Sequence, residues 1–204
     1  ECQGKGFLAQ GLQGDWLEQG ALAGIDAADD DARGIEHVYQ DSQAAAQVAS
    51  GNSEDFQRQW VARLRNPSGL AVRGDRLFAV ERDGVAEIDI PTAAVVARHP
   101  IAGGRLLNDV AVAPDGTLYV SDSGGNVIYR LASGKAEVVA SGGEVRQPNG
   151  LLLDGGRLLF GNTGDGSVKA LDLASGEVTS LLRLGDGIVD GLRSDGAGNL
   201  IVSL

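Results

Sequence analysis

The chain has 204 residues, of which 43% are hydrophobic and 22% charged, and its formal net charge is −11. This is the composition of a globular protein, which excludes wholesale disorder, and no apolar run reaches the roughly 18–20 residues that a membrane-spanning helix needs. An acidic surface repels the phosphates of nucleic acid but leaves carboxylates free to bind a cation, so we expect neither a nucleic-acid partner nor a membrane span.

The first 33 residues lack the alternation of a β-strand. They are rich in Gly, Gln, Ala and Asp, and four aspartates lie between Asp26 and Asp31. Because these aspartates do not have the spacing of an EF-hand calcium loop, we interpret them as a solvated loop. Residues 1–33 are therefore expected to form an irregular N-terminal segment.

Residues 34–39 look like the start of a strand unit, with Glu36 as a candidate functional residue. Glu36 occupies the position that a polar residue holds in each of four later units, the first of which begins with Ser68. The distance from Glu36 to Ser68 is 32 residues, which is shorter than the later spacing. We expect either a shortened unit here or one that lacks residues.

A repeat of about 41 residues organises the rest of the chain. Glycine accounts for 31 of the 204 residues, about twice the usual share. The polar residue that opens each unit recurs at intervals of 40, 41 and 41 residues. A period in this range, with several strands per unit, is typical of a β-propeller or a similar array. The opening residues are Ser68, Asn108, Asn149 and Asp190.

Each complete unit contains four short strand-like runs separated by turns. In the second unit they are residues 110–112, 118–120, 127–131 and 136–140, and each turn contains glycine. Four antiparallel strands joined by hairpin turns form one propeller blade. The alternative is a β-sandwich of unrelated hairpins, which does not explain a register kept over three units. We predict an all-β fold, with residues 34–204 forming a single β-propeller domain of four-stranded blades.

The opening residues of the units are the candidate functional residues. The first strand of each propeller blade lines the central channel, so the residues that begin these strands meet at the channel mouth although they are far apart in sequence. Glu36, Asn108, Asn149 and Asp190 would then bring carboxylate and amide oxygens together, and such ligands suit Ca²⁺, Mg²⁺ or Mn²⁺. The alternative is that each residue caps a turn before a strand.

Other polar residues are expected to have structural roles. Glu81, Asp122 and Asn162 recur at intervals of 41 and 40 residues at the end of the second strand, and we expect them to bind backbone groups of the turns. Ser68 has no histidine partner in view, so we expect it to line the channel and not to act as a nucleophile. The single cysteine, Cys2, permits no internal disulfide and no Cys-based metal site.

Three segments carry a resemblance to a known family. They are residues 107–122, the Asn149-Gly150-Leu151 motif and the Asp190-Gly191-Leu192 motif. These segments resemble the SMP-30/gluconolactonase/LRE-like family, over residues 64–204 and more weakly over 34–63. The resemblance implies a six-bladed β-propeller with one divalent metal ion in its channel, held by Glu36, Asn149 and Asp190. Six blades of this length need roughly 246 residues, so we expect the chain to be incomplete, trimmed or completed by a partner.

The resemblance also implies a metal-dependent hydrolase that opens a small sugar lactone or a related ester. Ca²⁺ is the expected ion, with Mg²⁺, Mn²⁺ or Zn²⁺ as alternatives. Asp190 would be both metal ligand and catalytic base, and Asn108 and Ser68 would contact the small-molecule substrate. The alternative is a non-enzymatic propeller that binds a ligand or a protein, with at most a structural metal. The sequence does not assign an oligomeric state. It does not assign a compartment either, because a cytoplasmic protein and an exported protein whose signal peptide has been removed would look alike.

Overall fold

The computed structural model describes residues 35–39, 46–50, 57–185 and 188–204, and it describes side chains from Val61 onward, except that of Ala62. The expected irregular segment, residues 1–33, lies outside the described residues. Every regular element in the described part is a β-strand, which confirms the predicted all-β class.

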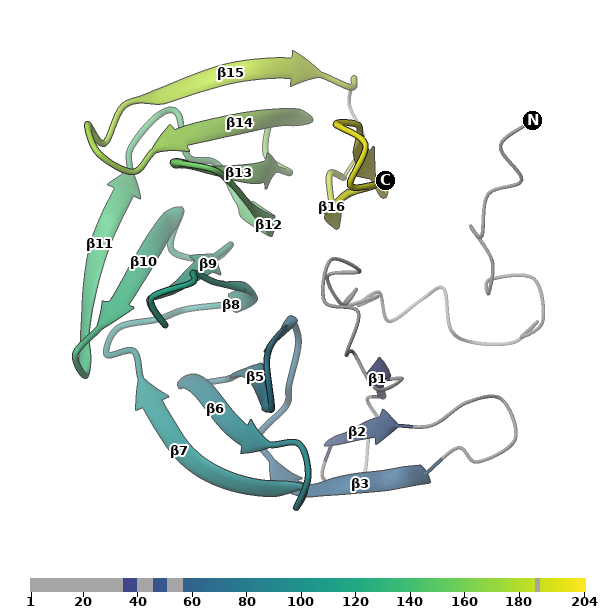
Figure 1. The fold of residues 1–204 in the computed structure, drawn as a ribbon. Helices are drawn as coiled ribbons and strands as arrows, with labels where there is room; N and C mark the ends of the chain where they lie inside the picture. Colours follow the sequence, from purple (N-terminus) through teal and green to yellow (C-terminus); the bar gives the residue numbers. More distant parts are fainter. Residues whose placement is uncertain (1–34, 40–45, 51–56, 186–187) are drawn as a thin grey trace, which may run out of the picture.

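Three four-stranded antiparallel sheets form the blades of a β-propeller. Each sheet keeps the order of the chain from its first to its fourth strand. In Figure 1 the strands β8, β12 and β16 lie toward the centre of the molecule, and β7, β11 and β15 lie at the outside. Blade 1 contains β4 (Leu70–Arg73), β5 (Arg76–Glu81), β6 (Gly84–Asp89) and β7 (Ala94–Pro100). Blade 2 contains β8 (Leu107–Val112), β9 (Leu118–Asp122), β10 (Val127–Ala132) and β11 (Lys135–Ser141). Blade 3 contains β12 (Pro148–Asp154), β13 (Arg157–Asn162), β14 (Ser167–Asp172) and β15 (Val178–Arg183).

Two smaller sheets stand before blade 1 and after blade 3. The first is three-stranded, with β1 (Ile35–Tyr39), β2 (Ala46–Ser50) and β3 (Gln57–Leu64). The second pairs β16 (Leu192–Ser194) with β17 (Leu200–Val202). The three-stranded sheet agrees with the shortened unit expected around Glu36. Val61 and Leu64 of β3 pack against the core of blade 1, so this sheet occupies the place of a blade.

The position of a strand within its blade explains its apolar pattern. In β13 every residue except Arg157 is buried, because neighbouring blades cover both faces of this strand. An uninterrupted apolar run such as Leu158-Leu159-Phe160 is therefore expected, as in other strands buried on both faces. The fourth strands lie at the outside, and β15 is exposed along nearly its whole length.

Apolar contacts between blades form the core. Successive residues of β12 point to opposite faces, so Leu151 packs with Phe160 toward blade 2 while Leu152 packs with Val189 and Leu192 toward the last sheet. Burying a side chain of this size contributes roughly 1.5–3 kcal/mol. Each blade is thus stabilised chiefly by its two neighbours, which fixes the positions of the first strands around the centre.

Buried polar side chains hold the loops that lead into the first strands. Glu81, Asp122 and Asn162 are at most 2% exposed, and each accepts a backbone N–H from the loop in front of its blade. This confirms the turn-binding role predicted for them. Because the same bond recurs in three blades, the loops before β4, β8 and β12 have equivalent positions. The bonds run from Arg65 N to Glu81 Oε1 at 2.8 Å, from Arg105 N to Asp122 Oδ2 at 2.9 Å and from Arg146 N to Asn162 Oδ1 at 2.7 Å.

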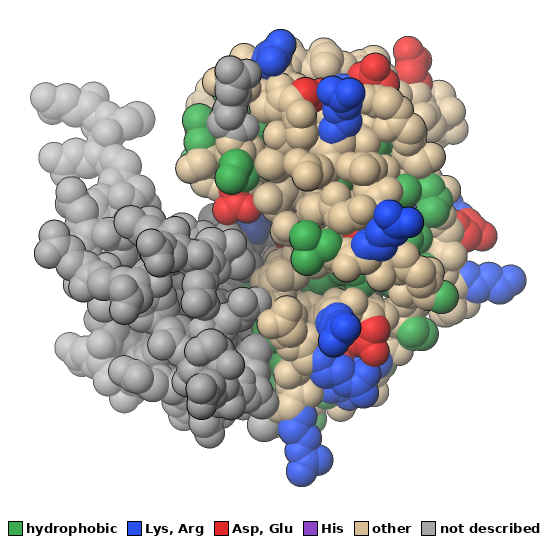
Figure 2. Space-filling view, turned by 180° about the vertical axis from the view of Figure 1, so that it is seen from behind, with side chains coloured by type: hydrophobic (Ala, Val, Ile, Leu, Met, Phe, Trp, Pro, Cys, Tyr) green, Lys and Arg blue, Asp and Glu red, His purple; other side chains and the backbone are tan. Residues whose placement is uncertain are grey.

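Charged side chains of both signs are dispersed over the described surface in Figure 2. Within the residues that the structure describes, no helix is long and apolar enough to cross a membrane.

Candidate metal and substrate site at the inner strands

Irregular pairing at the start of the first strands positions two of the predicted residues. The register between β8 and β9 slips between Leu107 and Val110, and an equivalent slip occurs where β12 pairs with β13. Asn108 and Asn149, the second residues of β8 and β12, lie in these irregular stretches. A bulge removes its residues from the regular ladder and redirects their side chains. The repeat therefore places an amide side chain at the same point in two neighbouring blades.

Backbone hydrogen bonds join the first strands of neighbouring units at these positions. Gly69 N donates to Asn108 O, and Gly150 N donates to Asp190 O, both at 2.7 Å. A Cβ on Gly150 would lie 2.1 Å from Asp190 O, so only glycine permits this approach. The recurrence of glycine after the opening residue thus has a direct cause in the contact between units.

Ser68 lies beside Asn108. The Ser68 hydroxyl donates to Asn108 O at 2.7 Å. Its proton is therefore engaged by backbone, which agrees with a lining role and not with that of a nucleophile. The Asn108 side chain is half-buried.

Asn149 and Asp190 form the polar pair that the repeat predicted. The Asn149 side chain lies close enough to the Asp190 carboxyl to influence its pKa, although 41 residues separate the two residues. Burial raises the pKa of the half-buried Asp190 carboxyl, and the Asn149 side chain acts in the opposite direction. No positively charged group among the described residues affects the pKa of Asp190. Within the described residues, Asp190 is thus a partly desolvated carboxylate without a positive partner, and such a group would be stabilised by a bound cation.

The side chain of Glu36 lies outside the described residues, so only its backbone position is known. Glu36 belongs to β1, which is the first strand of its sheet. The pairing of β1 with β2 is irregular between Ile35 and His37, which places Glu36 in a distortion like those at Asn108 and Asn149. Its role as a third metal ligand stays a prediction.

Asp109 is a buried acid of the site that the sequence analysis missed. Its Oδ1 accepts Val110 N at 2.8 Å, and its Oδ2 accepts Leu151 N of blade 3 at 2.8 Å. The pKa of Asp109 is raised to about 6: burial raises it most and the Asp190 carboxylate adds to this, whereas the two backbone hydrogen bonds and the charge of Arg193 lower it. Asp109 thus ties blade 2 to blade 3.

The sequence repeat distinguishes Asp109 from its counterparts in the other units. Asp109 occupies the position that glycine holds in the other units, at Gly69, Gly150 and Gly191. In place of donating its N–H to the next unit, it donates to Ser121 Oγ at 3.0 Å and uses its side chain for the contact between blades.

Arg193 is a second missed residue. In the repeat it stands where the other units have Ala71, Ala111 and Leu152. Its Nη1 donates to the carbonyl of Leu192 at 2.8 Å, whereas its Nε is buried and has no hydrogen-bond partner among the residues that the structure describes. The sequence shows an arginine at a position that is apolar in the other units. It does not show the orientation of the side chain, which depends on the neighbouring units.

The described residues include two of the three side chains predicted to bind a metal ion. No group of three or more His, Cys, Asp or Glu side chains that could hold a metal forms among them. They do bring together one carboxylate, from Asp190, and one amide, from Asn149. Both offer hard oxygen atoms, the donor type that Ca²⁺ and Mg²⁺ prefer. The donor set fits such an ion if Glu36 adds its carboxylate.

Comparisons with known proteins identify the fold. No family model matches the chain, and no curated protein matches it either. The solved structures that it resembles include XC5397 from Xanthomonas campestris, described as a gluconolactonase, with a TM-score of 0.63 and 23% identity over 77% of this chain and 62% of that one. The chain forms a β-propeller.

Other similar structures belong to propellers with different roles. Virginiamycin B lyase from Staphylococcus aureus gives a TM-score of 0.61 at 13% identity, over 81% of this chain and 61% of that one. A chain of a nidogen/laminin complex gives 0.62 at 19% identity, over 78% and 63%. The chain thus spans less than two thirds of the length of each of these three proteins, and at such identities the likeness establishes the fold alone.

Proposed function

We propose that this protein is a metal-dependent hydrolase that opens a small sugar lactone or a related ester. The observation that carries the proposal is the contact between Asn149 and Asp190, where an amide and an uncompensated carboxylate from separate units meet at the first strands. The resemblance of their motifs to the SMP-30/gluconolactonase/LRE-like family supports it, as does the likeness to a structure described as a gluconolactonase.

Glu36, Asn149 and Asp190 would hold one divalent ion, with Ca²⁺ as the first candidate. Such an ion, when bound, polarises a carbonyl group and makes a water molecule more acidic. Asn149 would contribute a neutral oxygen beside the Asp190 carboxylate, whose pKa it lowers.

Asp190 would also act as the base. It takes a proton from the water molecule as the water oxygen bonds to the carbonyl carbon, and the proton returns to the ring oxygen as the carbon–oxygen bond of the lactone breaks. The product is a hydroxy acid. Asn108 would orient the substrate through its amide, and Ser68 keeps the backbone of Asn108 in place through its 2.7 Å hydrogen bond.

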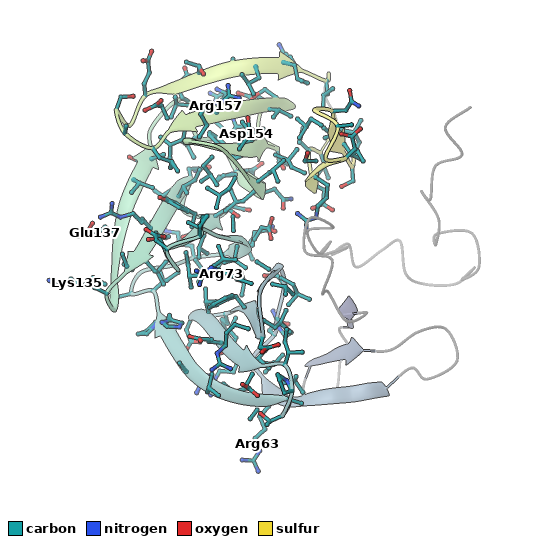
Figure 3. The ribbon with its side chains drawn as sticks, in the orientation of Figure 1. Arg63, Arg73, Lys135, Glu137, Asp154 and Arg157 are labelled. Atoms are coloured by element: carbon teal, nitrogen blue, oxygen red, sulfur yellow. The ribbon has the colours of Figure 1, made fainter. Side chains whose placement is uncertain are left out.

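Hydrolysis of D-glucono-1,5-lactone tests the proposal. The protein is stripped with a chelator, reloaded with Ca²⁺, Mg²⁺, Mn²⁺ or Zn²⁺, and assayed in a pH-stat against the spontaneous reaction. We expect the reloaded protein to accelerate hydrolysis. Asp190→Ala should abolish the acceleration, and Asp154→Ala, at an exposed ion pair with Arg157 (labelled in Figure 3), should retain it.

Two results would contradict the proposal. One is a fully active Asp190→Ala variant. The other is a folded, metal-loaded protein that accelerates hydrolysis of no lactone or ester in a panel, which would favour the non-enzymatic alternative.

A further inference from the structure

The burial pattern around the opening residues is the same in four units. In each unit the opening residue is half-buried, the residue before it is buried, and the residue two before it is exposed. Because alternate residues of an extended chain point to one side, the exposed residue shares the side of the opening residue. The 2.7 Å bond from Gly150 N to Asp190 O brings the starts of two first strands together, so these exposed residues border the candidate site. They are Asn66, Leu106, Gln147 and Ile188.

Two of the four bordering residues are large and apolar. Leu106 and Ile188 are each 60% exposed, whereas Asn66 and Gln147 have the polar side chains that are usual at exposed positions. A single exposed apolar residue is common on a protein surface and needs no explanation. Two of them at one position of the repeat, both beside the candidate site, indicate a surface that a ligand covers.

Hydrogen bonds hold the backbone of Leu106 in this place. Leu106 N donates to Asp122 Oδ1 at 2.8 Å, and the Leu106 carbonyl accepts Ser123 N at 2.9 Å. The Asp122 side chain that holds the loop is itself fully buried. Leu106 therefore cannot withdraw from solvent without breaking these bonds, and its side chain is preorganised for contact with a ligand.

Ile188 is held through the residue that follows it. Val189 is fully buried and packs with Leu152 of β12. The carbonyl of Val189 accepts the Thr163 hydroxyl at 3.1 Å. The chain next to Ile188 is thus fixed to blade 3, which leaves the Ile188 side chain at the surface.

We propose that the site takes a lactone or ester with an apolar substituent, and that Leu106 and Ile188 contact this substituent at the edge of the site. The proposal rests on the proposed function for the reaction, and it adds the substrate class. Asn108 would bind the polar end of the substrate, and the apolar arm would extend over Leu106, two residues earlier in the chain. Contact between the arm and these side chains removes apolar surface from water, a gain that a lactone with hydroxyl groups alone does not offer.

Two lactones that differ only in alkyl length provide the test. γ-Valerolactone carries a methyl group on its ring, and γ-nonalactone carries a pentyl group. Each CH₂ group that becomes buried is worth up to about 4-fold, so we expect kcat/KM for γ-nonalactone to exceed that for γ-valerolactone by at least about 10-fold. Leu106→Ser and Ile188→Ser should each lower this ratio by about 3- to 10-fold. The matched control is Val138→Ser, 51% exposed in the outer strand β11 (Figure 1), which should keep the wild-type ratio.

The outcomes separate this proposal from the hydrolase proposal. If glucono-lactone is hydrolysed but γ-nonalactone is not preferred to γ-valerolactone, the hydrolase proposal stands and the apolar contact is overturned. A ratio that is the same in wild type, Leu106→Ser and Ile188→Ser overturns it too.

Calorimetry with the two product acids decides the case in which no lactone is hydrolysed. Tighter binding of 4-hydroxynonanoate than of 4-hydroxypentanoate, with the difference reduced in Leu106→Ser, would support the apolar contact although the hydrolase proposal fails. Equal binding of the two acids, or binding of neither, would overturn both proposals.

Discussion

Replacement of Gly150 by alanine tests the contact between blade 3 and the β16–β17 sheet. A Cβ at this position would lie 2.1 Å from Asp190 O and 2.9 Å from the Gly191 Cα, where 3.4 Å is an ordinary contact. The obstacle is backbone, which cannot turn away as a side chain can. The two first strands must therefore separate by about 1 Å, which breaks the Gly150 N–Asp190 O hydrogen bond.

The expected loss of stability follows from these contacts. The broken hydrogen bond costs about 1 kcal/mol, and crowding in a packed region costs about 1–3 kcal/mol more. Alanine restricts the unfolded chain and returns about 0.4–1 kcal/mol. We therefore expect Gly150→Ala to lower the free energy of unfolding by about 1–4 kcal/mol.

Urea unfolding followed by circular dichroism measures this difference. The matched control is Gly156→Ala in the same blade, because no atom lies within 4 Å of the Cβ it would add and its φ is outside the left-handed region. The control should lose no stability. If Gly150→Ala is as stable as the control, the first strands do not approach one another as described.

Three further changes test other parts of the structure. Because the pKa of Asp109 rises to about 6 in the folded protein from 3.8, this group binds more protons in the folded state between these pH values; its contribution to stability should fall by about 3 kcal/mol as the pH rises through this window. Urea titrations at several pH values should show a flatter profile for Asp109→Asn, and parallel profiles would contradict the assignment. Asp122→Ala should lower the free energy of unfolding by at least about 3 kcal/mol, because the buried carboxylate accepts three backbone N–H groups. The control Asp154→Ala removes an exposed carboxylate and should cost less than about 1 kcal/mol. Equal losses of stability in the two variants would refute this prediction. Lys169 is 5% exposed and pairs with Glu144 and, at 3.5 Å, with Asp165. Lys169→Met should therefore stay within about 1 kcal/mol of wild type, while the double change Glu144→Gln with Asp165→Asn, which leaves the buried charge unpaired, is the more damaging. Thermal melts showing the reverse order would contradict this.

Most of the site residues were predicted from their position within the repeat. Ser68, Asn108, Asn149 and Asp190 share one position in a 41-residue period, and a propeller brings one position of successive units to one place. The same logic predicted that Glu81 and its counterparts bind turns. These features depend on local pattern and on the circular arrangement of units alone.

Asp109 and Arg193 could not be assigned in the same way. Regular alternation along β8 does not predict the direction of Asp109, because the bulge at its start redirects the side chain. The partner of Asp109, Leu151 N, belongs to another blade, and for the buried Nε of Arg193 the described residues supply no partner. The sequence does show that both residues depart from the repeat, because each is charged where the other units have glycine or an apolar residue. The contacts that they make could be found only in the structure.

Calcium binding tests the central claim most directly, which is that Asn149 and Asp190 from separate units share one ion. Isothermal titration of the metal-free protein with Ca²⁺ should show one site per chain. That site should be lost in Asp190→Ala and in Asn149→Ala, and retained in Asp154→Ala. A wild-type protein that binds no Ca²⁺ or other divalent ion, or an Asn149→Ala variant that binds it as tightly as wild type, would contradict the claim.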